Sequence, residues 1–342
     1  MRRHLLRWVR LALTEPISQL IIGARGSPLS LAQTRATLLS LISLNPAIKG
    51  DIRPIVTKGD DLTATPEALG LKGLFSREIE KALLAGEIDV AIHSAKDLPI
   101  ELPWGLTLGP IPERGPAVDA LVTLEGLTLE ELPSGSKVGT SSLRRKALIM
   151  ALRPDLIVVP VRGNLETRLA HLTKGTFTAL CLAEAGLVRL NQKDWPRVLL
   201  DPAVFPPAPG QGALALEIRA NDPKTARLLA PLNHPESALR LALERGVAAA
   251  LGVGCQTPAA AYAAVKDGSY EVTALVLAPD GGRRVQLTQN LTPTTLEEAR
   301  DMGLALGRLI LSQGGLELLA ALNGASGASG ASVASDPARP AR

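Results

Sequence analysis

The stretch LIIGARGSPLSLA, residues 20–32, decides the fold class. Leu20 to Ala24 is an apolar run of the kind that forms a buried strand, and Arg25-Gly26-Ser27 predicts a turn. Ser27 is a good N-cap and Pro28 suits the first position of a helix, so a strand, a turn and a helix follow one another directly. Such units, alternating along the chain, are typical of α/β layers around a largely parallel sheet.

The helix that begins at Pro28 has an expected buried stripe of leucine and isoleucine side chains, namely Leu31, Leu38, Leu39 and Ile42. Three further stretches repeat the opening pattern, in which an apolar run ends in polar and basic residues. They are DVAIHSAKDLP (89–99), KVGTSSLRRKA (137–147) and VVPVRGNLETRL (158–169). Because ligands of open α/β sheets bind outside the carboxyl ends of the strands, these four turns are candidate parts of one binding site.

The stretch TSSLRR, residues 140–145, places two arginines in the first turn of a predicted helix. Thr140, Ser141 or Ser142 would cap this helix. Arg144 and Arg145 would then oppose the helix macrodipole, which is reasonable if an anion lies between them. The alternative is a solvated first turn that tolerates the small cost.

Asp97 closes the second of these stretches, just ahead of Pro99. A carboxylate surrounded by cations stays ionised and could stabilise a positive intermediate or carry a proton. The alternative is an aspartate that caps the next turn. In RGNLETR, Asn164 is the expected cap, with Arg162 before the helix and Arg168 one turn inside it.

Composition narrows the possible functions. The 342 residues predict two or three domains, and the aromatic content of 2% argues against a protein that stacks single-stranded nucleic acid. The 37 basic residues comprise 26 Arg and 11 Lys, and arginine grips carboxylates and phosphates with paired hydrogen bonds. Two cysteines and four scattered histidines give neither a disulfide framework nor the spacing of a metal site.

Two Pro- and Gly-rich passages, 109–118 and 201–212, interrupt the α/β pattern, and we expect the chain to cross between two lobes there. A smaller unit follows from about residue 238, with a helix at 239–251 and strands at 270–277 and 284–287. The basic N-terminal segment resembles a surface or targeting helix or a disordered extension, and the C-terminal tail is of low complexity. No later segment reaches the roughly 20 uninterrupted apolar residues of a membrane span.

The two cysteines differ in context. Cys181 lies in the apolar stretch TALCLAEAGL and is interpreted as a core residue. Cys255 lies in the turn-like stretch GVGCQTP, which would leave its sulfur accessible as a nucleophile or an attachment point. From this segment alone, a spectator cysteine is the favoured interpretation of Cys255.

Taken in order, eight segments resemble the porphobilinogen deaminase family, the hydroxymethylbilane synthases of tetrapyrrole biosynthesis. The segments are IGARGSPLSLAQT, VTKGD, GLKGLFSREIEKALLAGEIDVAIHSAKDLP, VGTSSLRRKA, VRGNLETRL, LAEAGLVRL, PAPGQGALALEIR and GCQTPAAAYA. The resemblance covers residues 20–323, and the order and spacing of eight segments make it highly specific.

The resemblance implies two α/β lobes of the periplasmic-binding-protein type, with mixed sheets around a cleft, and a small α+β C-terminal domain that carries the cysteine. The expected boundaries are an N-terminal extension at 1–19, a first domain at 20–112 plus 207–232, a second at 113–206, a third at 233–323 and a tail at 324–342.

The resemblance also implies an activity. A family member joins four porphobilinogen molecules head to tail with release of ammonia, on a dipyrromethane cofactor held by a thioether to Cys255, and hydrolysis releases linear hydroxymethylbilane. Asp97 would be the catalytic residue. Each pyrrole carries an acetate and a propionate, which explains a cleft lined with arginines.

The resemblance gives roles to further residues. Ser94, Lys96, Thr140, Ser142, Arg144 and Arg145 would bind the cofactor. Arg25, Ser27, Arg162, Arg168, Arg189 and Gln211 would bind substrate or steer the chain. Lys72 and Phe75 would belong to a loop over the cleft, with Asp60 at its margin, and no metal is implied.

The sequence departs from the family pattern at three positions. Val118 replaces an arginine and puts a hinge contact in doubt, Val253 replaces a glycine before the cysteine, and Leu71 replaces another glycine. Two alternatives stand beside the transferase: a non-catalytic small-anion binder of the same fold, and, because of Val118 and Val253, a family member that folds without turning over. We expect a cytoplasmic monomer with porphobilinogen as its partner and with neither nucleic-acid nor membrane contacts.

Overall fold

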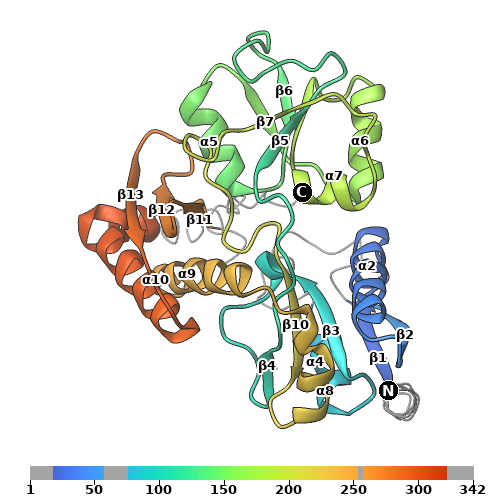
Figure 1. The fold of residues 1–342 in the computed structure, drawn as a ribbon. Coiled ribbons are helices and arrows are strands. Elements are labelled where there is room, and N and C mark those ends of the chain that lie inside the picture. The colour runs from blue at the N-terminus through green and yellow to red at the C-terminus, as the bar shows by residue number, and fades with distance from the viewer. Residues whose placement is uncertain (1–17, 58–75, 253–256, 322–342) are drawn as a thin grey trace, which may run out of the picture.

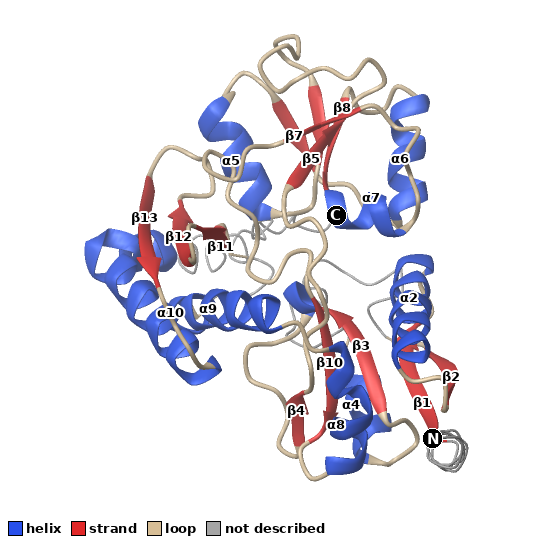
Figure 2. Ribbon diagram, in the orientation of Figure 1, coloured by secondary structure: helices blue, strands red, loops and turns tan. Residues whose placement is uncertain are grey.

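The computed structural model describes residues 18–57, 76–252 and 257–321. Within these ranges the chain forms two five-stranded sheets and one three-stranded sheet. The five-stranded sheets lie in separate lobes, and the three-stranded sheet lies beside their junction (Figure 1, Figure 2). The expected fold class, two α/β lobes with mixed sheets plus a small α+β unit, is confirmed.

The first lobe is built on a mixed sheet with helices on both faces. Its strands are β1 (Ser18–Arg25), β2 (Ile48–Ile55), β3 (Val90–Ser94), β4 (Leu106–Leu108) and β10 (Leu214–Arg219). Its helices are α2 (Pro28–Leu44), α4 (Arg77–Leu84) and α8 (Pro223–Leu229), with the 3-10 turns η2 (Ala95–Asp97) and η3 (Ala230–Leu232). The strand order is β2-β1-β3-β10-β4, in which β1 is parallel to β2 and β3, while β10 is antiparallel to β3 and β4. Helices α2 and α8 cover one face, and α4 covers the other.

Helix α2 begins as the sequence predicts, but it buries a different face. Ser27 accepts a hydrogen bond from the Ser30 amide as N-cap, and Pro28 is the first helical residue. The predicted stripe is wrong: Leu39 is 67% exposed, and Leu31, Leu38 and Ile42 are only half-buried. The residues that face the sheet are Ser30, Gln33, Thr34, Thr37 and Leu41.

This polar face can be buried because its side chains find partners. The hydroxyls of Thr34 and Thr37 donate to the carbonyls of Ser30 and Gln33, one helical turn earlier. A hydroxyl satisfied in this way costs little when buried. A pattern search that counts only leucine and isoleucine therefore places the buried face of α2 wrongly.

The second lobe repeats the architecture. Its strands are β5 (Asp119–Val122), β6 (Lys137–Gly139), β7 (Ile157–Val159), β8 (Ala179–Ala183) and β9 (Arg197–Leu199). Its helices are α5 (Leu143–Leu152), α6 (Leu165–Thr173) and α7 (Glu184–Arg189). The order is β7-β6-β8-β5-β9, with β6 parallel to β7 and β8, and β5 antiparallel to β8 and β9.

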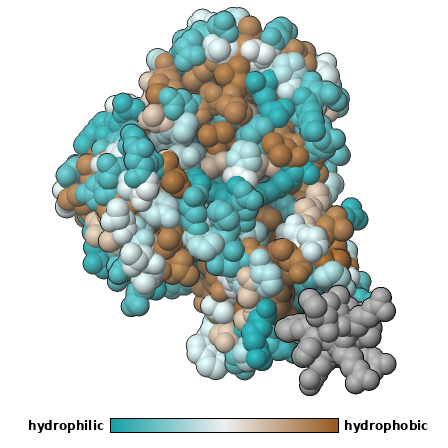
Figure 3. Space-filling view, in the orientation of Figure 1, coloured by the Kyte–Doolittle hydropathy of each residue, from teal (hydrophilic) through white to brown (hydrophobic). Residues whose placement is uncertain are grey.

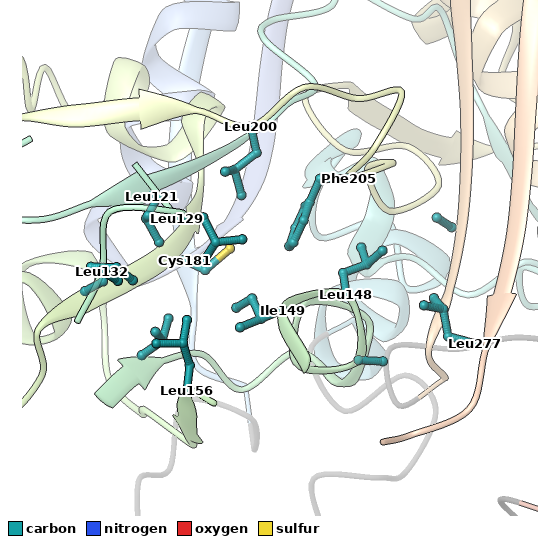
Figure 4. Close-up of a cluster of buried hydrophobic side chains, with 14 of the residues drawn as sticks. Leu121, Leu129, Leu132, Leu148, Ile149, Leu156, Cys181, Leu200, Phe205 and Leu277 are labelled. Atoms are coloured by element: carbon teal, nitrogen blue, oxygen red, sulfur yellow. The ribbon is translucent and has the colours of Figure 1, made fainter. Parts of the chain in front are cut away.

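Cys181 lies in the core of this lobe, as predicted. Its side chain is fully buried among apolar residues that include Leu148 and Ile149 of α5, with Phe205 nearby (Figure 4). Burial raises the pKa of the Cys181 thiol to about 12, so the thiol stays protonated and unreactive at neutral pH.

The chain passes between the lobes twice. Residues 109–118 run from β4 of the first sheet to β5 of the second, and residues 200–213 return from β9 to β10. Strand β10 then inserts between β3 and β4, although the whole second lobe separates it from them in sequence. The two passages therefore lie where polar groups from both lobes can meet.

The third unit packs an antiparallel sheet against two helices. It contains β11 (Ala259–Lys266), β12 (Ser269–Leu277), β13 (Arg284–Leu291), α9 (Pro235–Leu251), α10 (Leu296–Ile310) and a π-helical segment, η4 (Leu311–Gly315). The expected helix and both expected strands are present. Strand β11 was not predicted, because its sequence AAAYAAVK is dominated by alanine, a residue of low strand propensity.

One helical stretch in the described residues, Leu296–Ala321, is long and apolar enough to cross a membrane by length and composition. A single such helix is weak evidence for a span. The buried side chains of its first part, α10, include Ala299, Leu306 and Ile310, which join a core cluster with residues of α9. That packing accounts for its apolar face.

Candidate functional site

A pocket lies at the carboxyl edge of the first sheet, where β1 and β3 end and α2 begins. Four of the predicted site residues line it: Arg25, Ser27, Ser94 and Asp97. The other described residues of the wall are Leu29, Ser30, Gln33, Ser76, Ile92 and His93. Strand–turn–helix geometry thus brings together two of the four repeated stretches, 20–32 and 89–99, in one pocket.

Asp97 is the last residue of the turn η2 and is exposed at this pocket. The turn is fixed because the Ala95 amide donates to the Ala213 carbonyl and the Leu98 amide to the Ala95 carbonyl. The Asp97 carboxylate accepts no hydrogen bond from any residue in the described ranges, so it does not cap the turn. It faces the pocket as a charge that a ligand can approach.

Ser94 is held at the pocket wall by Gln33, a residue that was not predicted to belong to the site. The Gln33 side-chain amide donates to the Ser94 hydroxyl over 3.1 Å. Gln33 is one of the buried polar residues of α2, so its burial serves to fix the last residue of β3.

The two arginines of TSSLRR meet an anion, and that anion belongs to the chain itself. Asp119, at the start of β5, accepts hydrogen bonds of 2.7 Å from Arg144 Nη2 and 2.9 Å from Arg145 Nε. All three side chains are buried. Burial alone would raise the pKa of the Asp119 carboxyl, but Arg144 and Arg145 outweigh it and hold that pKa below its usual range.

The local fold around TSSLRR settles which residue caps α5. Ser142 is the N-cap and accepts from the Arg145 amide. The Thr140 hydroxyl is buried and accepts from the Ser142 amide, and Ser141 exchanges hydrogen bonds with the backbone of Val161. Thr140 and Ser142 therefore shape the end of β6, close to the paired arginines.

Gln211 joins the two lobes. Its side-chain nitrogen donates to the Ala117 carbonyl and to Asp119 Oδ1, over 2.7 and 2.8 Å. Its side-chain oxygen accepts from Lys96 Nζ at 3.2 Å and from Arg145 Nη2 at 3.3 Å. Lys96 follows β3 of the first lobe and Arg145 belongs to α5 of the second, so one amide oxygen receives a cation from each lobe.

The surroundings of Lys96 lower the pKa of its ammonium group. Burial lowers the pKa of its ammonium group to about 8, and the charge of Arg145 acts in the same direction, while Asp97 opposes both. An anionic ligand at this position would restore the charged form of Lys96.

Arg168 and Asn164 lie at the start of α6. Asn164 caps this helix, as predicted, by accepting from the Thr167 amide at 2.8 Å. Arg168 donates to the Gly163 carbonyl. Burial lowers the pKa of Arg168, Arg145 adds to this effect, and Asp97 opposes it, so Arg168 lies within electrostatic range of Asp97 in the other lobe.

The remaining predicted residues lie further along the same edge or outside the described ranges. Arg189, at the end of α7, donates to the Gly212 carbonyl over 2.6 Å, and burial lowers its pKa to about 10. Arg162 is exposed just before α6. Cys255, Lys72, Phe75, Asp60, Val253 and Leu71 lie outside the described residues.

Two acidic residues of the junction were missed by sequence reasoning. Asp119 is the partner of both arginines, and Glu244 of α9 accepts from Arg114 at 2.7 and 3.0 Å and from the Gly210 amide at 2.7 Å. The available signal was a charged residue inside an apolar run, DALV for Asp119. Such a residue is buried only with a partner, but the sequence does not name the partner.

The charges of this region favour a ligand with several carboxylates. Among the residues that the structure describes, this region brings together four cations, Lys96, Arg144, Arg145 and Arg168, and two carboxylates, Asp97 and Asp119. The Nε atom of Arg144 is buried without a hydrogen-bond partner among the described residues, which is a further unsatisfied donor.

The comparisons with known proteins agree with this site. The sequence model described as "Porphobilinogen deaminase, dipyromethane cofactor binding domain" matches residues 20–227, and that of the C-terminal domain matches residues 238–312. The chain belongs to the porphobilinogen deaminase family. It is 42% identical over 312 residues to the porphobilinogen deaminase of Paraburkholderia phymatum, covering 91% of this chain and 95% of the relative. It is 43% identical over 303 residues to that of Thermus thermophilus, covering 88% and 98%.

Membership of this family makes the chain a transferase of tetrapyrrole biosynthesis, a hydroxymethylbilane synthase that uses a dipyrromethane cofactor. Among solved structures, it is similar to an extracellular-binding protein of a probable amino-acid transporter from Bacillus subtilis, at 9% identity, a TM-score of 0.40 and coverage of 63% of this chain and 90% of that one. It is also similar to an arginine-specific periplasmic binding protein of Salmonella typhimurium, at 14% identity, a TM-score of 0.37 and coverage of 64% and 96%.

The cationic junction fits the cofactor of this family. A dipyrromethane carries an acetate and a propionate on each of two rings, and the described part of the site offers several cations, among them Arg144 and Arg145, that can pair with carboxylates. Two of the donors, Arg144 and Arg145, are already neutralised in part by Asp119.

Proposed function

We propose that this chain condenses four porphobilinogen molecules head to tail in the cleft between its two lobes, on a dipyrromethane primer attached to Cys255. The observation that carries the proposal is the position of Asp97, an exposed carboxylate in a pocket whose wall includes Arg25 and Ser27, within range of Arg168 from the opposite lobe. An anionic group among cations suits a substrate that carries carboxylates and develops positive charge as it reacts.

The residues that would hold the primer come from both lobes. Ser94 and Lys96 approach from β3 and η2, and Arg144 and Arg145 from α5, with Thr140 and Ser142 at the end of β6. When bound, the dipyrromethane supplies a pyrrole with a free α-carbon, which is the nucleophile of the first condensation. The cations neutralise its carboxylates, and Gln211 holds Lys96 and Arg145 at a fixed separation.

Asp97 would act on the incoming monomer. When the aminomethyl group of porphobilinogen loses ammonia, positive charge develops on the pyrrole, and a nearby carboxylate lowers the energy of that charge. Asp97 would also assist the proton transfers. Arg25, Ser27, Arg162, Arg168 and Arg189 would bind the acetate and propionate groups of the substrate or of the lengthening chain.

The loop residues and the domain boundaries complete the proposal. Lys72 and Phe75 would belong to a loop over the cleft. The three sheets would be the centres of three domains, at residues 20–112 plus 207–232, 113–206 and 233–323, between an extension at 1–19 and a tail at 324–342.

We further propose that the protein works as a cytoplasmic monomer without nucleic-acid or membrane partners. On the face drawn in Figure 3, hydrophilic residues gather at the level where the two lobes meet. A hydrophilic surface there is what a protein without a macromolecular partner at this level would present.

The test is a stoichiometric assay of the purified chain with porphobilinogen. The expected result is consumption of four porphobilinogen and release of four ammonia for each linear tetrapyrrole formed. Binding of porphobilinogen without release of ammonia would instead support the small-anion binder, and a chain that carries the primer but releases no ammonia would support a family member that has lost turnover.

A further inference from the structure

A cluster of three ionisable side chains lies beneath the catalytic pocket and has no part in the function proposed above. His93 of β3 lies 3.1 Å from Glu217 of β10, measured from Nε2 to Oε2. Glu80 of α4 belongs to the same cluster, since Glu217 and His93 both shift its pKa. The three residues are only 8%, 0% and 6% exposed.

The sheet register fixes this arrangement. His93 pairs with Ala215 and Ala91 pairs with Glu217 across the antiparallel β3–β10 ladder. Side chains two residues apart lie on the same face of a strand, so His93 and Glu217 are diagonal neighbours on the face that α4 covers. His93 is also part of the pocket wall, next to Ser94 and three residues after Val90.

The cluster contains polar atoms that the described residues leave unsatisfied. Oε1 of Glu217 and Oε1 of Glu80 are buried and have no hydrogen-bond partner there. Buried polar atoms of this kind are rare and mark strain or function. Burial raises the pKa of Glu80, and the Glu217 carboxylate acts in the same direction while His93 opposes it, so Glu80 keeps its proton to a higher pH than an exposed glutamate.

The two nitrogens of His93 have different surroundings. A carboxylate oxygen only accepts hydrogen bonds, so Nε2 is the protonated nitrogen when Glu217 is ionised. Nδ1 makes no hydrogen bond with a described residue and is not among the buried unsatisfied atoms. Because the ring lines the pocket, Nδ1 is the nitrogen that meets the pocket contents, and in this tautomer it is a base.

Charged groups on several neighbouring elements surround His93. They are Glu217 on β10, Glu80 and Arg77 on α4, Arg245 on α9, and Arg25 and Asp97 on the pocket wall. The nearest is Glu217, which stabilises an imidazolium, as the buried carboxylate of a catalytic triad does.

We propose that His93, oriented by Glu217, accepts the proton released at each condensation. This inference rests on the proposed function. The carbon–nitrogen bond of the aminomethyl group breaks with its electron pair on nitrogen, giving ammonia, and the pyrrole α-carbon forms the new carbon–carbon bond. The α-carbon–hydrogen bond then breaks, its electron pair restores the aromatic ring, and the proton binds Nδ1 of His93. Ammonia takes that proton and leaves as ammonium.

This assignment divides the work between two residues. Asp97 would stabilise the positive charge that develops on the pyrrole. An imidazole is by chemical class a better proton acceptor than a carboxylate, and Glu217 lies 3.1 Å from His93 to compensate the charged form without a further ion.

The test compares holoenzyme carrying His93→Gln with the wild-type holoenzyme. Gln can still donate to Glu217 but cannot accept a proton. We expect the cofactor and the KM to be retained, kcat to fall roughly 100-fold or more, and the acid limb of the kcat–pH profile to disappear. In Glu217→Gln, that acid limb should move to lower pH, because the imidazolium loses its counter-charge. His234→Asn, which keeps the N-cap of α9, is the matched control and should leave kcat unchanged.

A folded His93→Gln holoenzyme with wild-type kcat and pH profile would overturn the proposal and leave the pair as a purely structural contact. If this variant does not fold, ¹⁵N NMR of the wild-type histidines, four in the chain, decides the matter. The proposal requires the Nε2–H tautomer at His93, and the Nδ1–H tautomer overturns it. If the wild-type chain released no ammonia, the proposed function would be overturned. The tautomer of His93 would still show whether His93 and Glu217 are paired as described.

Discussion

The ammonium group of Lys96 lies 3.2 Å from the side-chain oxygen of Gln211, and this contact ties the first lobe to the returning passage of the chain. Arg145 of the second lobe donates to the same oxygen. Two cations from different lobes are thus held together by one neutral amide, with Asp119 as the nearest buried carboxylate to Arg145. An anionic ligand that binds at this junction would therefore be stabilised by both cations.

The contact makes stability depend on pH in a defined window. The pKa of Lys96 is about 8 in the folded chain, against an ordinary value of 10.5. Between these values the unfolded chain holds a proton that the folded chain has lost, so folding stability should rise with pH. Below pH 8 the full cost of burying the charge is present.

Lys96→Met removes this dependence. Both chains should carry Cys255→Ala, so that no carboxylate of the cofactor opposes the shift. As the pH rises from 8 to 10, the free energy of unfolding of the chain with Lys96 should increase relative to that of the Lys96→Met chain. Parallel curves for the two chains would show that Lys96 titrates normally.

Asp119→Asn should be strongly destabilising. It leaves Arg144 and Arg145 buried without their counter-charge, and loss of one partner of a buried ion pair costs about 3–5 kcal/mol. The matched control is Glu317→Gln, which breaks an exposed pair with Arg283 and should change little. Denaturant unfolding of both variants is the measurement, and equal stabilities would refute the role given to Asp119.

Asp97→Asn should separate chemistry from assembly. The carboxylate makes no hydrogen bond with described residues, so the variant should fold and carry its cofactor normally. Its kcat should fall by at least about 100-fold, the size expected for a lost proton-transfer or charge-stabilising group. Glu101→Gln, an exposed acid four residues further along, is the control. Near-normal turnover by Asp97→Asn would remove this residue from the chemistry.

Arg168→Leu should weaken substrate binding without unfolding the protein. Arg168 has no carboxylate partner among the described residues, and its donated hydrogen bond goes to a backbone carbonyl. Loss of one charge-assisted hydrogen bond to a carboxylate, about 1.5–3 kcal/mol, would raise KM for porphobilinogen at least about tenfold. Lys174→Leu, at the other end of α6, should leave KM as it is. If both variants kept the wild-type KM, Arg168 would have no part in binding.

Local patterns predicted the elements that carry the site. The caps Ser27 and Asn164, the turn that presents Asp97, and the core position of Cys181 follow from spacing and from residue type. Resemblance to the family supplied the activity and the cofactor.

Tertiary partners could not be predicted in this way. The sequence indicates that Arg144 and Arg145 need an anion, but the anion turns out to be Asp119, which lies 25 residues before Arg144 and reaches it only through the order of the second sheet. The buried polar face of α2 was missed for a related reason: hydroxyls that bond within their own helix do not show in a hydrophobic pattern.

We expect Cys255 to carry an oligopyrrole primer whose carboxylates meet the cations of the junction, and intact-mass spectrometry detects this attachment. After incubation with porphobilinogen, the purified chain should be heavier than its polypeptide by two linked pyrrole units. Cys181→Ala should keep this increment and Cys255→Ala should lose it. An unmodified wild-type mass under saturating porphobilinogen would contradict the claim.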